Sequence, residues 1–398
     1  IRSLLPNPTR RKDLLIENLH LVQDTYGHIS AAHLAALAEE MKLSQTEVYE
    51  VATFYHHFDV VKEGETPPPP LTVRVCDGIT CEMMGANELT KALKDGLGDD
   101  VRVIHAPCVG ACDKAPCAVV KQNQIFNATT EDVLAAVDAN NVHQGIPDYA
   151  GLSTYLDGGG YRILEKCLSD KLTREDVCAA IDASGLRGLG GAGFPTGRKW
   201  GFLDGTPKPR MVAINADEGE PGTFKDRFCF ETDPHRVLEG ALIAAWAVDA
   251  YVVYIFLRDE YQASREILTR EITALQAEVL TGGIELHRRR GAGAYICGEE
   301  SAMLESIEGK RGLPRNRPPF PAQAGLWGHP NLINNVETMY WIPEILSHDT
   351  GWYEDAGRPH FYSVSGRVNN PGVKLAPAGV TVRQLIDDHC GGMQDGHT

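Results

Sequence analysis

The stretch GLRGLGGAGFPTGRKW, residues 185–200, decides the fold together with NADEGEPGTFKDR, residues 215–227. The first stretch holds five glycines from Gly185 to Gly193, and Lys199 follows shortly after them. Glycine lets a backbone approach a phosphate closely and turn its N–H groups toward an anion. A glycine cluster alone fits a flexible loop equally well, so its meaning depends on the second stretch.

The second stretch follows a short apolar run at residues 211–214 and carries three acidic side chains, Asp217, Glu218 and Glu220. Acidic groups in this position are expected at the carboxyl end of a strand, facing a ligand. The glycines, the lysine and this acidic loop together favour a nucleotide or flavin site over a structural loop.

Helix and strand patterns alternate through residues 161–357, which predicts a doubly wound, Rossmann-like α/β domain. The expected helices are 173–184, 234–248, 261–277 and 301–307, and the expected strands are 211–214, 251–257 and 284–288. From residue 361 to residue 398, short β patterns and a helix at 382–388 indicate the start of a β-grasp-like module.

The N-terminal part of the chain divides at four consecutive prolines, residues 67–70. Residues 1–66 predict a helical bundle, with Ser30 capping a helix at 31–41 and a capping box of Ser44 and Glu47 before a helix at 48–58. Residues 71–145 predict a small α/β domain, and a polar connector at 140–160 leads to the third region.

The composition excludes several classes of protein. A net charge of −16 argues against nucleic acid or an anionic membrane as a main partner. The longest apolar stretch, residues 238–257, is interrupted by Glu239 and Asp249, which predicts a buried helix running into a strand rather than a membrane span. Nothing near Ile1 resembles a secretory signal, so we expect a cytoplasmic protein.

Five of the ten cysteines lie between residues 76 and 117. Two close pairs stand out, each expected on a loop just after a strand: Cys76 with Cys81, and Cys108 with Cys112. Two pairs of this kind favour a metal centre over buried free thiols or a disulfide scaffold. The spacing leaves structural zinc and a four-thiolate [2Fe–2S] cluster equally open. Cys117 is expected to be structural.

A third glycine-rich segment, residues 291–301, precedes the expected helix at 301–307, whose N-terminal N–H groups would suit a phosphate. Downstream, Arg315 and Arg317 stand near Phe320, which indicates either a nucleotide contact or a solvated basic loop. Farther along lie two polar side chains that could bind phosphate or ribitol hydroxyls, or cap a helix: Asn334 and Asn335.

These motifs resemble a known family. Residues 188–200, 215–227, 291–300 and 318–338 resemble the FMN- and NADH-binding subunit of complex I and its diaphorase relatives. Residues 11–145 are similar to the thioredoxin-fold [2Fe–2S] subunit that partners it, including its N-terminal helical bundle. The resemblance, rather than the spacing, decides for [2Fe–2S] over zinc.

Both subunit types are fused in this chain, as in the diaphorase subunits of NAD-dependent formate dehydrogenases and NAD-reducing hydrogenases. Residues 108–113 and 365–377 look most like the β subunit of a molybdenum- or tungsten-dependent formate dehydrogenase. The resemblance therefore implies a catalytic partner subunit containing molybdenum or tungsten and iron–sulfur clusters. A hydrogenase diaphorase or a complex I-type NADH dehydrogenase is the alternative.

The family's roles carry over where positions match. The residues that would hold FMN are Gly188, Gly190, Lys199, Asn215, Asp217, Tyr295, Gly298, Glu299, Asn334 and Asn335. The residues that would bind NADH are Phe194, Phe202 and Phe320 at the adenine, Glu220 and Glu300 near the nicotinamide, and Arg317. Arg317 stands where complex I commonly has lysine, and the two cations are not interchangeable at a shaped site.

One departure from the family is large. Relatives carry a C-terminal helical domain whose Cys-x2-Cys-x2-Cys motif and distant fourth cysteine bind a [4Fe–4S] cluster. The remaining cysteines cannot supply that motif: Cys167, Cys178, Cys229, Cys297 and Cys390. We therefore expect the sequence to be a piece of a longer protein.

The chemistry that the resemblance implies is hydride exchange between nicotinamide and flavin, followed by single-electron steps to iron–sulfur clusters. Lys199 would stabilise the reduced flavin, and Glu220 would adjust the nicotinamide pocket. A colourless zinc scaffold is the rival interpretation. An electron-transfer module with a vestigial flavin site is a third, against which the intact motifs argue.

Overall fold

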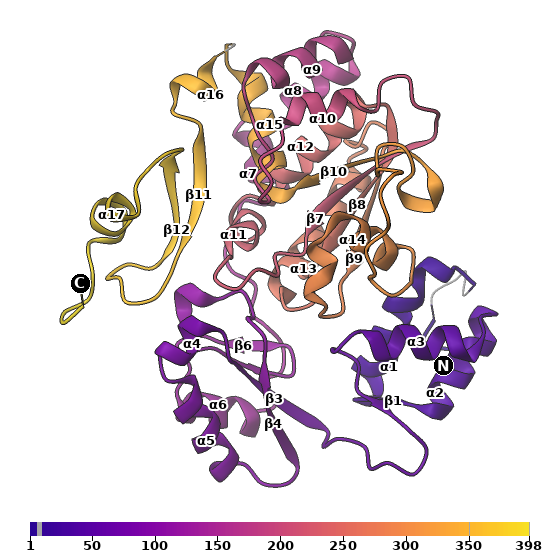
Figure 1. Cartoon of the computed structure of the whole chain (residues 1–398), viewed down its shortest axis with the longest axis vertical. Coiled ribbons are helices and arrows are strands. Elements are labelled where there is room, and N and C mark those ends of the chain that lie inside the picture. The colour runs from indigo at the N-terminus through magenta and orange to yellow at the C-terminus, as the bar shows by residue number, and fades with distance from the viewer. Residues whose placement is uncertain (6–9, 350, 398) are drawn as a thin grey trace.

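The computed structural model describes residues 1–5, 10–349 and 351–397. Its centre is a sheet of four parallel strands in the order β10-β7-β8-β9 (Figure 1). The strands are β7 (Arg210–Ala216), β8 (Ala250–Leu257), β9 (Glu285–Arg290) and β10 (Asn331–Asn335). The first three were expected from the sequence, and β10 was not. The expected apolar segment at 238–257 is helix α12 followed by β8.

Alternate side chains of the strands face two different cores. Val212, Ile214, Val253 and Ile255 pack in one core with helices on that side of the sheet. The helices are α8 (Arg162–Leu168), α9 (Arg174–Ala183), α10 (Thr196–Gly201), α11 (Lys225–Thr232), α12 (Pro234–Ala247), α13 (Gln262–Ala277) and α15 (Val336–Ser347). Helices α12 and α15 cross so closely that a Cβ on Gly240 would lie 2.0 Å from a backbone oxygen of α15.

The opposite face of the sheet is covered by the N-terminal bundle. The bundle consists of α1 (Leu15–Tyr26), α2 (Ala31–Met41) and α3 (Gln45–Phe54), with a two-residue parallel pair of β1 (Ile29–Ser30) and β2 (Val60–Val61). Its buried side chains share one continuous core with Val252, Tyr254 and Phe256 of β8. The bundle is therefore the second layer of the doubly wound fold.

The capping predictions in the bundle are confirmed. Ser30 accepts a hydrogen bond from the His33 N–H, and Ser44 and Glu47 form a capping box. The expected extension of the third helix to residue 58 is wrong, because the helix ends at Phe54. Tyr55 turns into an extended conformation and buries its ring, and its hydroxyl donates to the Lys310 carbonyl 2.7 Å away.

The segment after the prolines folds around its own sheet, in the order β4-β3-β5-β6. Strands β3 and β4 are parallel, whereas β5 and β6 run antiparallel to their neighbours. A separate apolar core lies beneath this sheet. The elements are β3 (Leu71–Cys76), α4 (Ile79–Met83), α5 (Ala86–Gly96), β4 (Val101–Ala106), β5 (Ala118–Val120), β6 (Asn123–Ile125) and α6 (Thr130–Asp138).

The remaining elements surround these two units. The connector at 140–160, expected to be irregular, contains the short helix α7 (Leu152–Asp157), and α14 (Glu300–Ile307) follows the third glycine segment. A C-terminal module of α16 (Trp352–Asp355), the antiparallel pair β11 (Pro359–Val364) and β12 (Gly372–Pro377), and α17 (Val382–Gln384) stands to one side (Figure 1). The helix expected at 382–388 is a short α segment that continues as a π turn.

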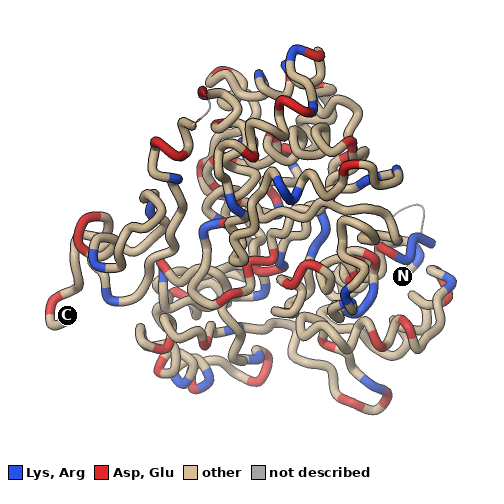
Figure 2. Tube along the Cα trace, turned by 45° about the horizontal axis from the view of Figure 1, so that its top comes forward, with Lys and Arg blue, Asp and Glu red and all other residues tan. Residues whose placement is uncertain are grey.

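The distribution of charge and the apolar character of the helices can be read along the described chain. Acidic and basic residues are interspersed along the described trace (Figure 2). Within the described residues, none of the helices combines the length and the apolar character needed to cross a membrane.

Candidate functional site

The predicted flavin residues meet at the carboxyl edge of the parallel sheet, where open α/β sheets bind their ligands. Asn215, near the end of β7, donates from Nδ2 to the Gly298 carbonyl 2.9 Å away, and its Oδ1 accepts the Asp217 N–H at 3.1 Å. The first bond ties the end of β7 to the loop after β9, and the second shapes the loop after β7. A Cβ on Gly298 would approach the Asp217 backbone oxygen at 3.4 Å, so the two loops lie close together.

The first glycine segment folds over the end of β10. The Gly188 N–H donates to the Phe194 carbonyl at 2.8 Å and closes the loop. Gly190 lies so close to Asn335 that an added Cβ would come within 2.9 Å of the asparagine Cβ. The Leu189 N–H donates to the Thr338 hydroxyl at 3.0 Å. The glycines thus allow this loop to reach the same edge as the loops after β7 and β9.

Two buried polar atoms at this edge have no hydrogen-bond partner: Asp217 Oδ2 and Asn334 Nδ2. Burial raises the pKa of Asp217 to about 7. One atom accepts hydrogen bonds and the other donates them, so this edge of the sheet holds both an unpaired acceptor and an unpaired donor, each on a residue predicted from the sequence. Buried groups of this kind are costly unless a ligand or water satisfies them.

Asn335 forms hydrogen bonds within the chain through both polar atoms of its side chain. Its Oδ1 accepts the Glu337 N–H at 2.9 Å, which caps α15, and its Nδ2 donates to Asp226 at 2.6 Å. Lys225 Nζ lies 3.4 Å from the same Oδ1. Of the two interpretations of this asparagine, the geometry of the ligand-free chain matches the helix cap.

A strip of alternating charges borders the edge. Lys199 Nζ lies 3.7 Å from Glu300, and Arg317 lies 3.1 Å from Glu300 and also pairs with Glu299. Burial lowers the pKa of Lys199. The expected free helix start after the third glycine segment is not free, because Glu299 accepts the Ser301 and Ala302 N–H groups at 2.9 Å.

The expected nucleotide residues are exposed next to this strip. Phe194 and Phe202 are 39% and 53% exposed, with ring centroids 5.6 Å apart, and Phe320 is 52% exposed. Glu220 accepts a hydrogen bond from the Tyr295 hydroxyl at 2.5 Å. Arg315, by contrast, is a structural residue: it binds Glu305, Glu308 and the Gly325 carbonyl.

The four paired cysteines lie together in the small α/β domain. All four are at most 5% exposed and are free thiols: Cys76, Cys81, Cys108 and Cys112. The sulfurs of Cys108 and Cys112 are 3.3 Å apart. Hydrogen bonding between the thiols raises the pKa of Cys76 and of Cys112. The Cys76 sulfur and the Cys108 side chain both lie beside Gly78, so the two pairs come near each other there. Two pairs of buried thiols are a donor set that suits a metal centre.

The setting of the cysteines differs from the expected loops. Cys76 is the last residue of β3, and Cys81 lies within the helix α4. Cys117, expected to be structural, donates from its thiol to the carbonyls of Ala111 and Lys114 at 3.2 Å. A Cβ on Gly78 would lie 3.4 Å from the Cys76 sulfur, so the backbone approaches the centre closely there.

The loop after β7 separates the two centres and contacts both. The sulfur-bearing side chains of Cys108 and Cys112 pack against Phe224 at the end of this loop. Arg258, which directly follows β8, donates to the Cys108 carbonyl at 2.7 Å. Arg258 was missed by sequence reasoning, although its place immediately after a strand was a usable signal.

Glu218 does not face a ligand, contrary to expectation. It is 8% exposed, and its carboxylate accepts the N–H groups of Asp226 and Arg227 at 3.1 and 3.2 Å and the Tyr261 hydroxyl at 2.9 Å. An acidic residue at a strand end has the same sequence pattern whether backbone N–H groups or a ligand satisfy it.

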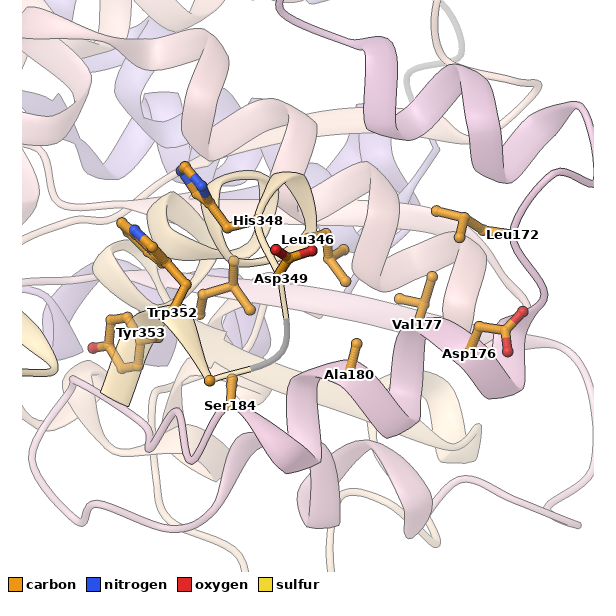
Figure 3. A pocket seen from close by; sticks show the side chains of 12 residues that line it. Leu172, Asp176, Val177, Ala180, Ser184, Leu346, His348, Asp349, Trp352 and Tyr353 are labelled. Atoms are coloured by element: carbon orange, nitrogen blue, oxygen red, sulfur yellow. The ribbon is translucent and has the colours of Figure 1, made fainter. Parts of the chain in front are cut away.

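Two cavities lie away from this edge of the sheet. A cavity of about 100 Å³ is lined by Leu172, Val177 and Trp352 among others (Figure 3), and a second of about 180 Å³ borders Tyr261. Nucleotide pockets usually occupy about 300 Å³ or more. None of the predicted site residues lines either of these two cavities.

Comparisons with known proteins match the three parts of the chain separately. Residues 181–344 match the Nuo51 FMN-binding domain, residues 1–141 the thioredoxin-like [2Fe–2S] ferredoxin family, and residues 361–398 the SLBB domain. A solved NAD⁺-reducing [NiFe]-hydrogenase in the air-oxidized state covers 98% of this chain and 71% of its own, with 30% identity and a TM-score of 0.82. The chain belongs to the family of complex I 51-kDa-type FMN-binding subunits with a thioredoxin-like [2Fe–2S] domain.

Curated relatives in this family match less of the chain. An NADH-quinone oxidoreductase subunit of Rhizobium meliloti (strain 1021) is 45% identical over 261 residues, covering 62% of either chain. The corresponding NADH-quinone oxidoreductase subunit of Aquifex aeolicus (strain VF5) is 46% identical over 261 residues, covering 62% of this chain and 60% of its own. The chain therefore spans about 60% of the length of these relatives.

The family confirms the expected fold class of a mixed α/β multidomain chain, and it confirms FMN and [2Fe–2S] as cofactors. The residues present fit both groups. The unpartnered Asp217 Oδ2 and Asn334 Nδ2 can meet the hydroxyl donors and the acceptor oxygens of a flavin nucleotide. The four buried thiols match a four-thiolate cluster.

Proposed function

We propose that this chain is a diaphorase module that passes electrons between NAD(H) and iron–sulfur clusters through FMN. The observation that carries the proposal is the loop 217–224, which touches the carboxyl edge of the sheet on one side and the cysteines on the other. A flavin held at that edge and a cluster held by the four thiols would be separated mainly by this loop.

FMN supplies two-electron exchange with a nicotinamide and one-electron exchange with a cluster. The residues proposed to hold it are Gly188, Gly190, Lys199, Asn215, Asp217, Tyr295, Gly298, Glu299, Asn334 and Asn335. Lys199 would place a positive charge in a partly buried position beside the ring, where a charge acts more strongly than in bulk water. Asp217 and Asn334 would orient the nucleotide through their unpartnered atoms.

The nicotinamide nucleotide is proposed to enter over the exposed aromatic residues, with Phe194, Phe202 and Phe320 stacking on the adenine. Arg317 would release Glu299 or Glu300 to bind the nucleotide. Glu220 and Glu300 would lie near the nicotinamide end.

The variant Glu220→Ala tests this assignment. We expect it to reduce NADH turnover and leave FMN bound, since Glu220 bonds to the Tyr295 hydroxyl and takes no part in the bond between Asn215 and Gly298 that joins the flavin loops. Tyr295→Phe is the matched control: it removes the hydroxyl that orients Glu220, so it should cause a smaller loss of the same kind. Unchanged turnover in Glu220→Ala would remove Glu220 from the site.

For the electron source, the proposal is a cytoplasmic formate dehydrogenase whose catalytic subunit contains molybdenum or tungsten and iron–sulfur clusters. The support is the pattern of residues 108–113 and 365–377. Part of the second segment borders the cysteine centre: the Ser365 hydroxyl lies 3.3 Å from that of Thr80, and Arg367 donates to the Met83 carbonyl at 2.8 Å.

An NAD-reducing hydrogenase is the second candidate, favoured by the hydrogenase structure that matches along the whole chain. The deciding experiment is anaerobic: formate or H₂ is added to the native complex, and the flavin absorbance is followed. Bleaching by formate, reversed by NAD⁺, supports the proposal. Bleaching by H₂ alone supports the hydrogenase, and bleaching by NADH alone points to a complex I-type donor arrangement. No bleaching by NADH overturns the diaphorase function itself.

A further inference from the structure

The flavin loop after β9 is held from outside the α/β domain by the N-terminal bundle. His20, in α1, lies with Nε2 2.8 Å from the Gly291 carbonyl oxygen. The His57 N–H donates to the Ala292 carbonyl at 3.3 Å. Gly293 sits against the His56 ring, where an added Cβ would be 2.5 Å from the ring. Three consecutive residues of the loop are therefore contacted by the bundle.

The contact from His20 defines its protonation. The ring is 1% exposed, and its Nδ1 has no hydrogen-bond partner. Because Nε2 faces a carbonyl oxygen, Nε2 carries the hydrogen and the ring is a neutral donor. Burial lowers the pKa of His20 well below its usual range, which agrees with a neutral ring.

Charged side chains fix the partner ring. His57 Nδ1 lies 2.9 Å from Asp259 Oδ2, and the two histidine rings are 4.9 Å apart. The other carboxylate oxygen of Asp259 accepts from Arg290 at 2.5 Å and from Arg265 at 3.1 Å. Asp259 follows β8 and Arg290 ends β9, so the rings are anchored to two strand ends of the sheet.

The same contacts decide against a metal ion. His20, His57 and Asp259 could offer three ligand atoms within 4.8 Å of one another. Both oxygens of Asp259 are already bonded to cationic or N–H donors, however, and two guanidinium groups beside the site would repel a cation. His20, His57 and Asp259 are therefore better suited to hold the backbone of the loop after β9 than to bind a metal ion.

We propose that His20 is a positioning residue for the flavin site, acting through the Gly291 carbonyl on the loop 291–298. This rests on the proposed function, in which Tyr295, Gly298 and Glu299 of that loop hold FMN. The bond fixes the start of the loop on its far side, while Asn215 fixes its end through the Gly298 carbonyl. The bundle thereby contributes to cofactor binding without touching the cofactor.

The test compares His20→Leu with His20→Gln in the full chain. Leucine fills the site without a donor, whereas glutamine places an amide N–H near the position of Nε2. FMN affinity is measured by quenching of flavin fluorescence on titration into flavin-depleted protein. We expect His20→Leu to weaken FMN binding about ten-fold, the size of one net hydrogen bond, and His20→Gln to restore most of it.

Hydrogen exchange in the flavin-depleted protein gives a readout that needs no cofactor. We expect His20→Leu to speed exchange in peptides covering residues 291–298 and to leave residues 187–195 unchanged. The control is Leu37→Ala in α2, a buried bundle residue in a helix that packs on α3 and β1. It should destabilise the bundle and leave the FMN affinity of the folded protein unchanged.

The outcomes separate the two ideas. We call the hold of His20 on the loop 291–298 through the Gly291 carbonyl the clamp. If the wild-type chain binds no FMN, the proposed function fails, while faster exchange at 291–298 in His20→Leu would still establish the clamp. If His20→Leu binds FMN normally and exchanges normally, the clamp is refuted. The clamp is also refuted if His20→Gln is as weak as His20→Leu, or if Leu37→Ala weakens FMN binding equally, because the effect would then be one of packing.

Discussion

The bundle and the thioredoxin-like domain follow one another in the chain, but they attach to the parallel sheet by different physics. The bundle joins it through a dry seam, in which side chains such as Leu19 and Val48 share a core with Phe256. The thioredoxin-like domain keeps its own core and meets the sheet domain through polar pairs, besides the contact of Cys108 and Cys112 with Phe224. Arg227 lies 3.0 Å from Asp113, and Gln124 donates to the Glu260 carbonyl at 3.0 Å.

This difference in packing indicates that the bundle and the parallel sheet form one folding unit, and that the thioredoxin-like domain forms another. A parallel sheet needs cover on both faces, and the bundle, together with α14, covers the face of β8 that carries Val252, Tyr254 and Phe256. Polar junctions between domains resemble transient interfaces, and each side of such a junction can keep its fold alone. The family match over residues 1–141 thus joins two segments that belong to different cores.

The largest effect is expected at the seam. Phe256→Ala removes a fully buried ring from the shared core and should cost about 3–5 kcal/mol of unfolding free energy. Bundle and sheet should unfold together, seen as one transition in helical circular dichroism and flavin fluorescence. Tyr251→Ala, on the same strand but 44% exposed, should change stability little. Separate transitions for bundle and sheet would contradict the shared core.

The matched change on the other side of the comparison is Leu93→Ala, in the core of the thioredoxin-like domain. It should cost about 2–5 kcal/mol, and only in the transition that bleaches the [2Fe–2S] absorbance. FMN should remain bound through that transition. Release of FMN at the same denaturant concentration would mean that the two units are one cooperative block.

Local features of both regions were predictable because they depend on near neighbours in the chain. The capping box of Ser44 and Glu47 and the strands β3 and β8 are written in residues a few positions apart. The shared seam was not predictable, since periodicity marks an apolar helix face and does not say which surface covers it. Leu19 and Phe256 are 237 positions apart.

The candidate site divides in the same way. The glycines and the paired cysteines were found from composition and spacing, and the structure brings each set together. Glu218 was expected to face a ligand, but backbone N–H groups and the Tyr261 hydroxyl occupy its carboxylate. His20 was missed because it acts on a backbone carbonyl, and such a contact leaves no motif in the sequence, whereas Arg258 could have been found from its place directly after a strand.

A smaller effect is expected at the polar junction. Gln124 is 8% exposed and donates to the carbonyls of Val109 and Glu260 at 3.0 Å. Gln124→Leu leaves both carbonyls without a donor and should weaken docking of the thioredoxin-like domain by about 1–3 kcal/mol. Faster hydrogen exchange on both sides of the junction, with both cofactors retained, is the expected result. An intact junction with a less stable cluster domain would assign Gln124 to internal packing.

The smallest effect is expected at two helix caps. They are a close test of the comparison, because one caps a helix of the bundle and the other a helix of the thioredoxin-like domain. Ser44→Ala and Thr129→Ala each remove a side chain that accepts an N3 backbone N–H, and each should cost about 1 kcal/mol. Ser44 caps α3 of the bundle, so its loss should lower the temperature at which bundle and sheet unfold together. Thr129 caps α6, and its loss should shift only the transition of the cluster domain. Calorimetry of both variants resolves the two transitions, and a shift of the cluster transition by Ser44→Ala would show that the bundle follows its neighbour in sequence and not the sheet it covers.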